Sequence, residues 1–409
     1  MAGGRERQTA IYLGGVSGLQ PRVPVDAARL EARAAECMAP EAFAYVAAGA
    51  GNEDTLRANR AAFDRWRIVP RMLRDVSERD TSIELLGRRL DSPFLLAPIG
   101  VLELAHREAD LAVARAARAE GVPMIFSNQA SKPMEECAEV LGDSPHWFQL
   151  YWSSSNELVE SFVARAESCG CEAIVVTLDT TLLAWRPRDL EPAFLPFLRG
   201  KGIAQYTSDP VFRRLTSDAP AAATPEPRPN LSALRTLFQV IRSGAGRAGV
   251  QKFIEIYSRP SLTWDDLPFL RERTKLPILL KGILHPDDGR RAIEAGVDGI
   301  VVSNHGGRQV DGAVATLEAL PGLVEAVDGR VPLILDSGIR GGADAFKALA
   351  LGAAAVLIGR PYVHGLAIAG EAGVREVIKN FKADFDLTVG CAGCRSVAEI
   401  GPDRLSRAA

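Results

Sequence analysis

Short apolar runs recur along the chain, each six to eight residues long and rich in Val, Ile, Leu or Phe. Such nearly continuous apolar sequence is typical of strands that are buried on both faces, as in parallel sheets. The pattern therefore predicts eight strands: PFLLAP (93–98), VPMIFSN (122–128), HWFQLY (146–151), EAIVVTLD (172–179), LPILLKG (276–282), DGIVVSN (298–304), VPLILDSG (331–338) and AAVLIGR (354–360).

Stretches with helical spacing separate these strands, for example ADLAVARAARAEG (109–121) and GADAFKALALG (342–352). Eight strands that alternate with helices predict an α/β protein with a (β/α)8 TIM barrel. A doubly wound open sheet is the structural alternative. Residues 24–64 also read as helical, with a turn at 49–51. We therefore expect an N-terminal helical extension, residues 1–70, packed on a barrel formed by residues 71–409.

The connection from the fourth to the fifth strand is much longer than the others. It predicts an insertion at about residues 187–262, and a connection of this length is usually functional or disordered. Residues 217–230 are rich in Pro and Ala, which is typical of a mobile segment, whereas residues 231–258 look helical in parts. A lid or a subunit contact is favoured over a membrane-surface anchor because the basic residues are few.

Charge and hydropathy narrow the class of protein. The formal net charge is −3, so there is no overall basic character to attract nucleic acid. The N-terminus lacks an apolar stretch of signal-peptide length, and no run approaches the roughly 18 apolar residues of a spanning helix. We expect a cytoplasmic protein without a membrane partner.

Six cysteines are scattered along the chain, and a reducing cytosol makes structural disulfides unfavourable. Cys391 and Cys394 form a CxxC pair near the C-terminus. No second ligand pair follows at a spacing suited to zinc, so no metal site is predicted.

Polar residues and glycines collect where the predicted strands end, which is where barrel enzymes place their active sites. In chain order these candidates are Ala97, Pro98, Ile99, Gly100, Ser127, Gln149, Tyr151, Thr177, Asp179, Arg186, Lys281, Ser303, Asn304, His305, Arg308, Asp336, Gly338, Arg340, Gly359 and Arg360.

The ends of the last two strands predict an anion site. Gly338, Arg340, Gly359 and Arg360 follow strands seven and eight, where backbone N–H groups and a helix N-terminus commonly bind phosphate in this fold. The two arginines would add charge-assisted hydrogen bonds. The pattern therefore indicates a phosphate-bearing cofactor.

A second group of strand-end residues predicts acid–base chemistry on a small carboxylate. Arg186 and Arg308 are suited to a bidentate grip on a carboxylate, and His305 is a base that titrates near neutral pH. Asp179 could orient the imidazole of His305. A protein that only binds the cofactor, as a partner or scaffold, is the alternative, although it would need few of these residues.

The motifs SNHGGRQVDG, LKG, LDSGIRGGADAFKALALGA and IGRP resemble those of the FMN-dependent L-2-hydroxy-acid oxidases and dehydrogenases, the glycolate and lactate oxidase group. The resemblance runs from residues 45–63 to residues 394–401. The stretches RANRAAFDRW, APIGV, WRPRDL, FLPFLRG, TSDPVF and KGILHPDD look closest to the lactate 2-monooxygenase branch. However, the long insertion and the C-terminal LTVGCAGCRSVAEIG depart from that branch.

The resemblance implies a role for each candidate. His305 would take the proton in substrate oxidation and Asp179 would stabilise its imidazolium, while Arg186, Arg308, Tyr45 and Tyr151 would bind the substrate. Lys281 would stabilise negative charge on the reduced flavin. The remaining residues would bind FMN: Ala97, Pro98, Ile99, Gly100, Ser127, Gln149 and Thr177 near the isoalloxazine ring, Ser303 beside it, and Asp336, Gly338, Arg340, Gly359 and Arg360 along the ribityl chain and phosphate.

The same resemblance implies oxidation of a small L-2-hydroxy acid to the 2-keto acid with O2 as acceptor. Glycolate and lactate oxidases typically have alanine where this chain has Gly100, whereas lactate 2-monooxygenase has glycine. Gly100 therefore favours a coupled oxidative decarboxylation. An oxidase that releases H2O2 and a dehydrogenase with another acceptor are the alternatives.

The resemblance also predicts the assembly. Members of this group form tetramers or octamers, and the apolar part of the insertion, residues 234–257, offers additional contact area. We expect a homotetramer or octamer, to be measured by light scattering at micromolar concentration. A monomeric mass would contradict this expectation.

Overall fold

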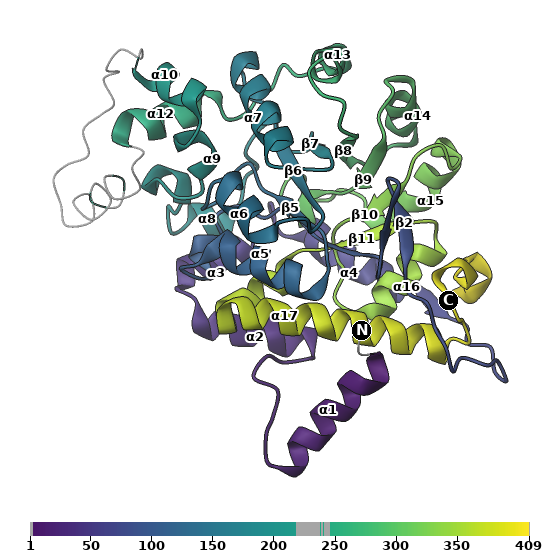
Figure 1. The fold of residues 1–409 in the computed structure, drawn as a ribbon. Coiled ribbons are helices and arrows are strands. Elements are labelled where there is room, and N and C mark those ends of the chain that lie inside the picture. The colour runs from purple at the N-terminus through teal and green to yellow at the C-terminus, as the bar shows by residue number, and fades with distance from the viewer. Residues whose placement is uncertain (1–2, 218–237, 239, 241–245, 409) are drawn as a thin grey trace.

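The computed structural model describes residues 3–217, 238, 240 and 246–408 (Figure 1). Eight parallel strands close into a barrel in the order β10-β11-β4-β5-β6-β7-β8-β9. The closed barrel confirms the predicted (β/α)8 fold and excludes the open sheet. Each predicted run contains one strand: β4 (Phe94–Leu96), β5 (Met124–Phe126), β6 (His146–Tyr151), β7 (Ile174–Thr177), β8 (Ile278–Ile283), β9 (Gly299–Val302), β10 (Leu333–Leu335) and β11 (Ala355–Ile358).

The core of the barrel has two apolar layers because side chains alternate along each strand. Leu95 and Ile125 belong to the cluster that fills the interior. Leu96 and Phe126 belong to the larger cluster between strands and helices. The strands are therefore apolar on both faces, as their sequences indicated, and only the strand ends are left for polar chemistry.

Helices surround the barrel as predicted, and residues 109–121 and 342–352 contain α5 and α16. The helices that follow barrel strands are α5 (Ala109–Glu120), α6 (Met134–Leu141), α7 (Asn156–Ser168), α14 (Pro286–Glu294), α15 (Thr316–Val327), α16 (Gly342–Ala350) and α17 (Arg360–Cys391), and α13 (Leu267–Arg271) precedes β8. Two small antiparallel pairs were not predicted: β1 (Trp66–Ile68) with β12 (Leu405–Arg407), and β2 (Ile83–Leu85) with β3 (Arg88–Leu90).

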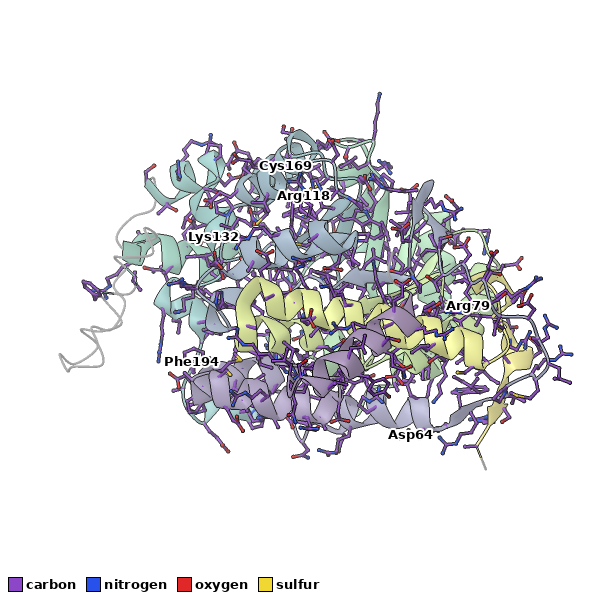
Figure 2. The ribbon with its side chains drawn as sticks, turned by 60° about the horizontal axis from the view of Figure 1, so that its bottom comes forward. Asp64, Arg79, Arg118, Lys132, Cys169 and Phe194 are labelled. Carbon is purple, nitrogen blue, oxygen red and sulfur yellow. The ribbon has the colours of Figure 1, made fainter. Side chains whose placement is uncertain are left out.

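The N-terminal region contains the expected helices, α2 (Ala27–Cys37), α3 (Pro40–Ala47) and α4 (Asp54–Asp64), and the turn at 49–51 lies between the last two. Helix α2 packs against α17, as both views show (Figures 1 and 2). A further helix, α1 (Gly4–Val16), was not predicted. The backbone N–H of Gly4 donates a hydrogen bond to Asp386 of α17, and the side chain of Arg79, labelled in Figure 2, donates to the same carboxylate.

The described part of the insertion contains α8 (Pro187–Leu190), α9 (Ala204–Thr207), α10 (Pro210–Ser217) and α12 (Gly246–Ile256). Its aromatic side chains attach it to the barrel. The ring of Tyr206 lies 5.1 Å from that of Phe162 on α7 and 4.8 Å from that of Phe253 on α12, in edge-to-face geometry. Almost all of the Pro-rich stretch 217–230, and most of residues 231–245, lie outside the described residues.

The described residues were also searched for membrane-spanning helices and for metal sites. No helix among them is long and apolar enough to cross a membrane. Within the same part of the chain, no group of three or more His, Cys, Asp or Glu side chains could hold a metal ion. Cys391 is exposed at the end of α17, whereas Cys394 is buried with its thiol 3.6 Å from the carbonyl oxygen of Glu399.

Candidate active site

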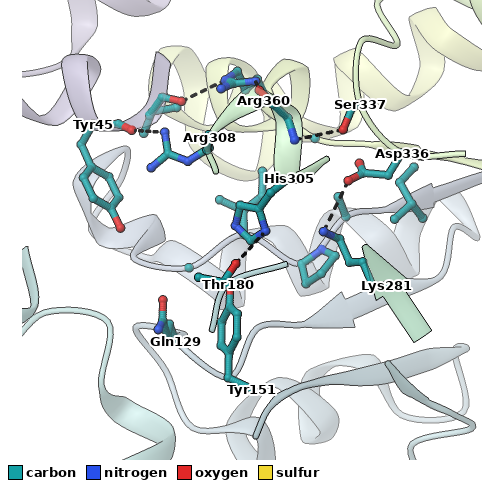
Figure 3. Close-up of a pocket in the computed structure, with 18 of the residues that line it drawn as sticks. Tyr45, Gln129, Tyr151, Thr180, Lys281, His305, Arg308, Asp336, Ser337 and Arg360 are labelled. Carbon is teal, nitrogen blue, oxygen red and sulfur yellow. Dashed lines mark hydrogen bonds and ion pairs between the residues drawn. The ribbon is translucent and has the colours of Figure 1, made fainter. Parts of the chain in front are cut away.

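A pocket opens at the carboxyl ends of the barrel strands (Figure 3). Its volume, open mouth included, is about 1110 Å³, which is large enough for a cofactor and a small substrate together. Most of the predicted site residues line it: Tyr45, Ala97, Pro98, Ile99, Gly100, Tyr151, Arg186, Lys281, His305, Arg308, Asp336, Gly338, Arg340, Gly359 and Arg360.

His305 reaches the pocket because the chain turns sharply after β9. His305, Gly306 and Gly307 all have positive φ angles, of 57°, 67° and 76°. A side chain on Gly307 would place its Cβ 2.6 Å from the backbone nitrogen of Leu56 on α4, so only glycine fits there. The backbone N–H of His305 donates to the hydroxyl of Ser303, which fixes the start of the turn.

Two residues that follow β7, Asp179 and Thr180, orient the imidazole of His305. Its Nδ1 lies 2.7 Å from Oδ1 of Asp179 and 3.1 Å from the hydroxyl of Thr180, which itself donates to Asp179. A carboxylate beside Nδ1 favours the tautomer with the proton on Nδ1. The Nε2 atom then carries the lone pair that can accept a proton.

Burial and charge set the protonation of this pair. Burial lowers the pKa of His305 below its usual value and outweighs the opposite effect of Asp179. Burial alone would raise the pKa of Asp179, but the charge of Lys281 and the hydrogen bonds from His305 and Thr180 hold it well below its usual range. At neutral pH the site therefore contains a neutral imidazole beside an ionised carboxylate, which is the arrangement that a general base requires.

Lys281 joins the two acidic residues of the site. Its ammonium group donates to the hydroxyl of Ser303 at 3.0 Å and lies 3.5 Å from the carboxylates of both Asp179 and Asp336. Ser303 in turn donates to Asp336 at 2.6 Å. Burial would lower the pKa of Lys281, but the two carboxylates raise it, so its positive charge is stable.

Two arginines lie together at one side of the pocket. The Nε atom of Arg186 donates to the backbone oxygen of Arg308, and Arg308 donates to the backbone oxygens of Tyr45 and Ala48 at the end of α3. Burial and the repulsion from Arg308 lower the pKa of Arg186 to about 10. A bound carboxylate would relieve this repulsion, so the pair suits an anionic substrate.

A second cationic region lies at the ends of β10 and β11. Burial, followed by the charges of Arg308 and Arg340, lowers the pKa of Arg360 to about 9. Arg360 donates to the backbone oxygens of Val46, Gly306 and Ala48, so it also ties α3 to the turn after His305. The N-terminus of α17 begins here, and no side chain caps it. This combination suits a phosphate group.

Six predicted residues do not line the pocket: Asp179, Ser127, Gln149, Thr177, Ser303 and Asn304. Gln149 accepts hydrogen bonds from Ser127 and from the backbone of Asn128. The Nε2 atom of Gln149 and the hydroxyl of Thr177 are buried and have no hydrogen-bond partner among the described residues. Unpaired buried polar atoms of this kind are expected where a ligand supplies the missing partner.

Sequence reasoning missed several residues that line the pocket: Val46, Gln129, Thr180, Leu183, Phe197, Tyr257, Gly306, Ser337, Ile339 and Leu357. Gln129 lies in the loop just beyond the second strand, so its position past a strand end was a signal that could have found it. Phe197 and Tyr257 come from the insertion, which was expected only to cover the site as a whole. His106, which follows the first barrel strand, does not line the pocket and accepts a hydrogen bond from the backbone of Glu108.

The barrel, the phosphate-suited cationic region and the buried base together suit an enzyme that uses a phosphate-bearing cofactor. A family model described as FMN-dependent dehydrogenase matches residues 34–407, which is nearly the whole chain. The chain belongs to this FMN-dependent family, and the family's cofactor confirms the prediction of FMN. The unpaired atoms of Gln149 and Thr177 fit the polar edge of the flavin ring, and the region of Arg340 and Arg360 fits its phosphate.

Similar proteins include an L-lactate oxidase of Lysinibacillus sphaericus, 44% identical over 378 residues that cover 92% of each chain. A 4-hydroxymandelate oxidase of Amycolatopsis orientalis is 41% identical over 91% of this chain and 96% of its own. Among solved structures, mandelate oxidase with (S)-4-hydroxymandelic acid aligns with a TM-score of 0.79 at 39% identity, covering 94% of this chain and 98% of the other.

The state of His305 predicts a pH dependence. A base must be neutral to accept a proton, so the second-order rate of flavin reduction should be constant above the pKa of His305 and fall below it. Because burial lowers this pKa, we expect the fall below about pH 6.5, the value of an ordinary histidine. Anaerobic stopped-flow measurement across pH tests this.

The variant Asp179→Asn tests whether His305 is the group that titrates in this pH profile. Asp179 raises the pKa of His305, so its loss should move the fall to still lower pH. The same change should slow reduction by roughly 10²–10⁴-fold, because the imidazolium loses its partner. A fall that moves to higher pH in Asp179→Asn would show that another group titrates.

Proposed function

We propose that the protein oxidises a small L-2-hydroxy acid to the corresponding 2-keto acid, with FMN as cofactor and O2 as the final acceptor. The observation that carries this proposal is a neutral, buried imidazole paired with Asp179 in the pocket that also contains two arginines. The names of the similar proteins, which are oxidases and dehydrogenases of 2-hydroxy acids, support the substrate class.

Substrate binding follows from the charges. Arg186 and Arg308 hold the carboxylate, and the repulsion between them falls when it binds. Tyr45 and Tyr151 line the same pocket, and their pKa values are raised by burial, so their hydroxyls stay protonated and can donate hydrogen bonds to the substrate oxygens. These contacts place the 2-hydroxyl within reach of His305.

Proton transfer follows from the tautomer. The Nε2 atom of His305 takes the proton of the 2-hydroxyl, and Asp179 stabilises the imidazolium that results. Bound FMN supplies the chemistry of a two-electron acceptor and of a donor to O2. Lys281 keeps a positive charge in the pocket, which favours the build-up of negative charge nearby. The pocket also suits the later release of the proton, because His305 returns to its neutral state at neutral pH.

Oxidative decarboxylation is the second candidate function, and Gly100 favours it through the resemblance to the monooxygenase branch. The structure changes how this glycine is interpreted. A methyl group on Gly100 would lie 2.9 Å from the carbonyl oxygen of Gln129 and 3.0 Å from its Cβ. The absent methyl therefore makes room for Gln129, and this packing neither supports nor opposes a reaction between peroxide and keto acid.

One experiment distinguishes the functions. We expect L-2-hydroxy acids such as L-lactate to bleach the flavin absorbance under anaerobic conditions and O2 to restore it. No bleaching by any 2-hydroxy acid would favour a protein that only binds FMN. In air with catalase present, acetate and CO2 from L-lactate would indicate decarboxylation inside the pocket. Pyruvate would indicate an oxidase, and slow reoxidation by O2 would indicate a dehydrogenase.

His305→Gln tests the base itself. Glutamine has a hydrogen-bonding side chain of similar reach but cannot accept the proton. Flavin should stay bound, because the residues that suit its ring edge and phosphate are elsewhere, and reduction by substrate should slow by roughly 10²–10⁴-fold or more. The measurement is anaerobic stopped-flow absorbance, with the spectrum of bound flavin as the control for cofactor content. Reduction at the wild-type rate would contradict the proposed mechanism.

A further inference from the structure

Gln129 has an unsatisfied side-chain amide at the pocket. The residue is only 8% exposed and lines the pocket, yet its amide makes no hydrogen bond with any described residue. Figure 3 shows Gln129 on the side of the pocket away from Lys281 and Asp336, with its amide directed into the open space. An amide that faces the pocket and has no partner in the protein is free to donate and accept hydrogen bonds with a ligand group there.

The backbone of Gln129 is fixed from three sides. Its N–H donates to the hydroxyl of Ser127 at 3.1 Å, and its carbonyl oxygen accepts from the N–H of Val101 at 2.9 Å. The neighbouring carbonyl, of Ala130, accepts from Ala204 of the insertion. Loops after β4 and β5 and the insertion therefore hold Gln129 together, and its side chain starts from a rigid point.

Two glycines allow this placement. A Cβ at Gly100 would lie within 3.0 Å of Gln129, and a Cβ at Gly202, where φ is +68°, would lie 3.1 Å from the carbonyl oxygen of Gln129 and 2.6 Å from Val101. A larger residue at either position would displace Gln129. The close packing on both sides fixes the backbone and Cβ of Gln129, from which the amide extends.

Several neutral residues line the pocket together with Gln129. Leu183 and Phe197 line the pocket with apolar surface, and Tyr257 adds a hydroxyl that has no hydrogen-bond partner among the described residues. Figure 3 shows Arg308, Arg360, Lys281 and Asp336 away from the amide. A neutral hydrogen-bonding group fits this end better than a charged group, which would lack a counter-ion.

We propose that Gln129 is a specificity-determining residue that hydrogen-bonds a hydroxyl group on the side chain of the substrate. The preferred substrate is then an L-2-hydroxy acid with a second, neutral hydroxyl beyond C2. This inference rests on the proposed oxidation of 2-hydroxy acids and names the class of acid. A substrate with a methyl group in place of that hydroxyl leaves the amide unpaired and reacts more slowly.

The test compares substrates that differ only in hydroxyl against methyl. Suitable pairs are L-glycerate with L-2-hydroxybutanoate, and (S)-4-hydroxymandelate with (S)-4-methylmandelate. We expect kcat/KM of the wild type to favour the hydroxyl member about tenfold or more in the pair whose hydroxyl reaches the amide. In Gln129→Met, which keeps the length of the side chain but removes the amide, the ratio should fall to about one or below.

Binding provides a readout that does not depend on turnover. The 2-keto acids hydroxypyruvate and 2-oxobutanoate form the corresponding pair, and their affinities are measured from the perturbation of the flavin spectrum. Gln129→Met should weaken hydroxypyruvate selectively. Leu183→Met is the matched control, because it changes an apolar wall for both members alike and should leave their ratio unchanged.

The outcomes separate this inference from the proposed function. If the wild type prefers the methyl member of both pairs, or if Gln129→Met leaves both ratios unchanged, the role of Gln129 is wrong although 2-hydroxy-acid oxidation stands. If no 2-hydroxy acid bleaches the flavin, the proposed function is wrong, and the keto-acid affinities still decide whether Gln129 recognises the hydroxyl.

Discussion

The concentration of positive charge at one end of the barrel is the constraint on which the site depends. Arg186, Arg308, Lys281, Arg340 and Arg360 all line one pocket. Only Lys281 has carboxylates close to it on two sides, Asp179 and Asp336. Arg186 has one carboxylate nearby, that of Asp189 at 3.8 Å. Buried positive charge with few counter-ions is unfavourable, so anionic ligands are favoured in this pocket. The phosphate of FMN and the carboxylate of a substrate are two anions that fit, because burial and mutual repulsion lower the pKa values of Arg186 and Arg360 and an anion would counter both effects.

The N-terminal extension is part of this site. Arg308 and Arg360 donate to backbone oxygens at the C-terminal end of α3, where the helix leaves carbonyl groups without intrahelical partners. Asn59 of α4 exchanges hydrogen bonds with Asn304 at 2.8 and 2.7 Å, directly before the turn that begins at His305. The barrel therefore supplies the strand ends, but the helices before it fix the arginines and the turn. Mutations in α3 and α4 should be considered as changes to the site.

The sequence predicted the barrel and the end of the pocket that contains His305, Asp179 and Lys281. Both can be recognised from short stretches of sequence. Strands buried on two faces read as apolar runs, and polar residues at their ends stand out. Helix α1 was missed because GRERQTAIYLGGV has no clear apolar stripe, and the β1–β12 pair because its partners are more than 300 residues apart. The position of the Gln129 amide could not be predicted, since it depends on a hydrogen bond with Val101 and on close packing with Gly202 of the insertion.

The end of the pocket at His305 and the end at Gln129 are held by different kinds of contact. At the reacting end, His305, Asp179 and Lys281 share hydrogen bonds and charges, so a change in one alters the protonation of the others. At the end near Gln129, neutral side chains from the loops and the insertion meet without ionic coupling. Substitutions there can change which substrate side chains the pocket accepts, while His305 and its pKa are left intact. The long insertion, through Phe197 and Tyr257, therefore lines the part of the pocket that has no ionic coupling, whereas His305, Asp179 and Lys281 come from the ends of barrel strands.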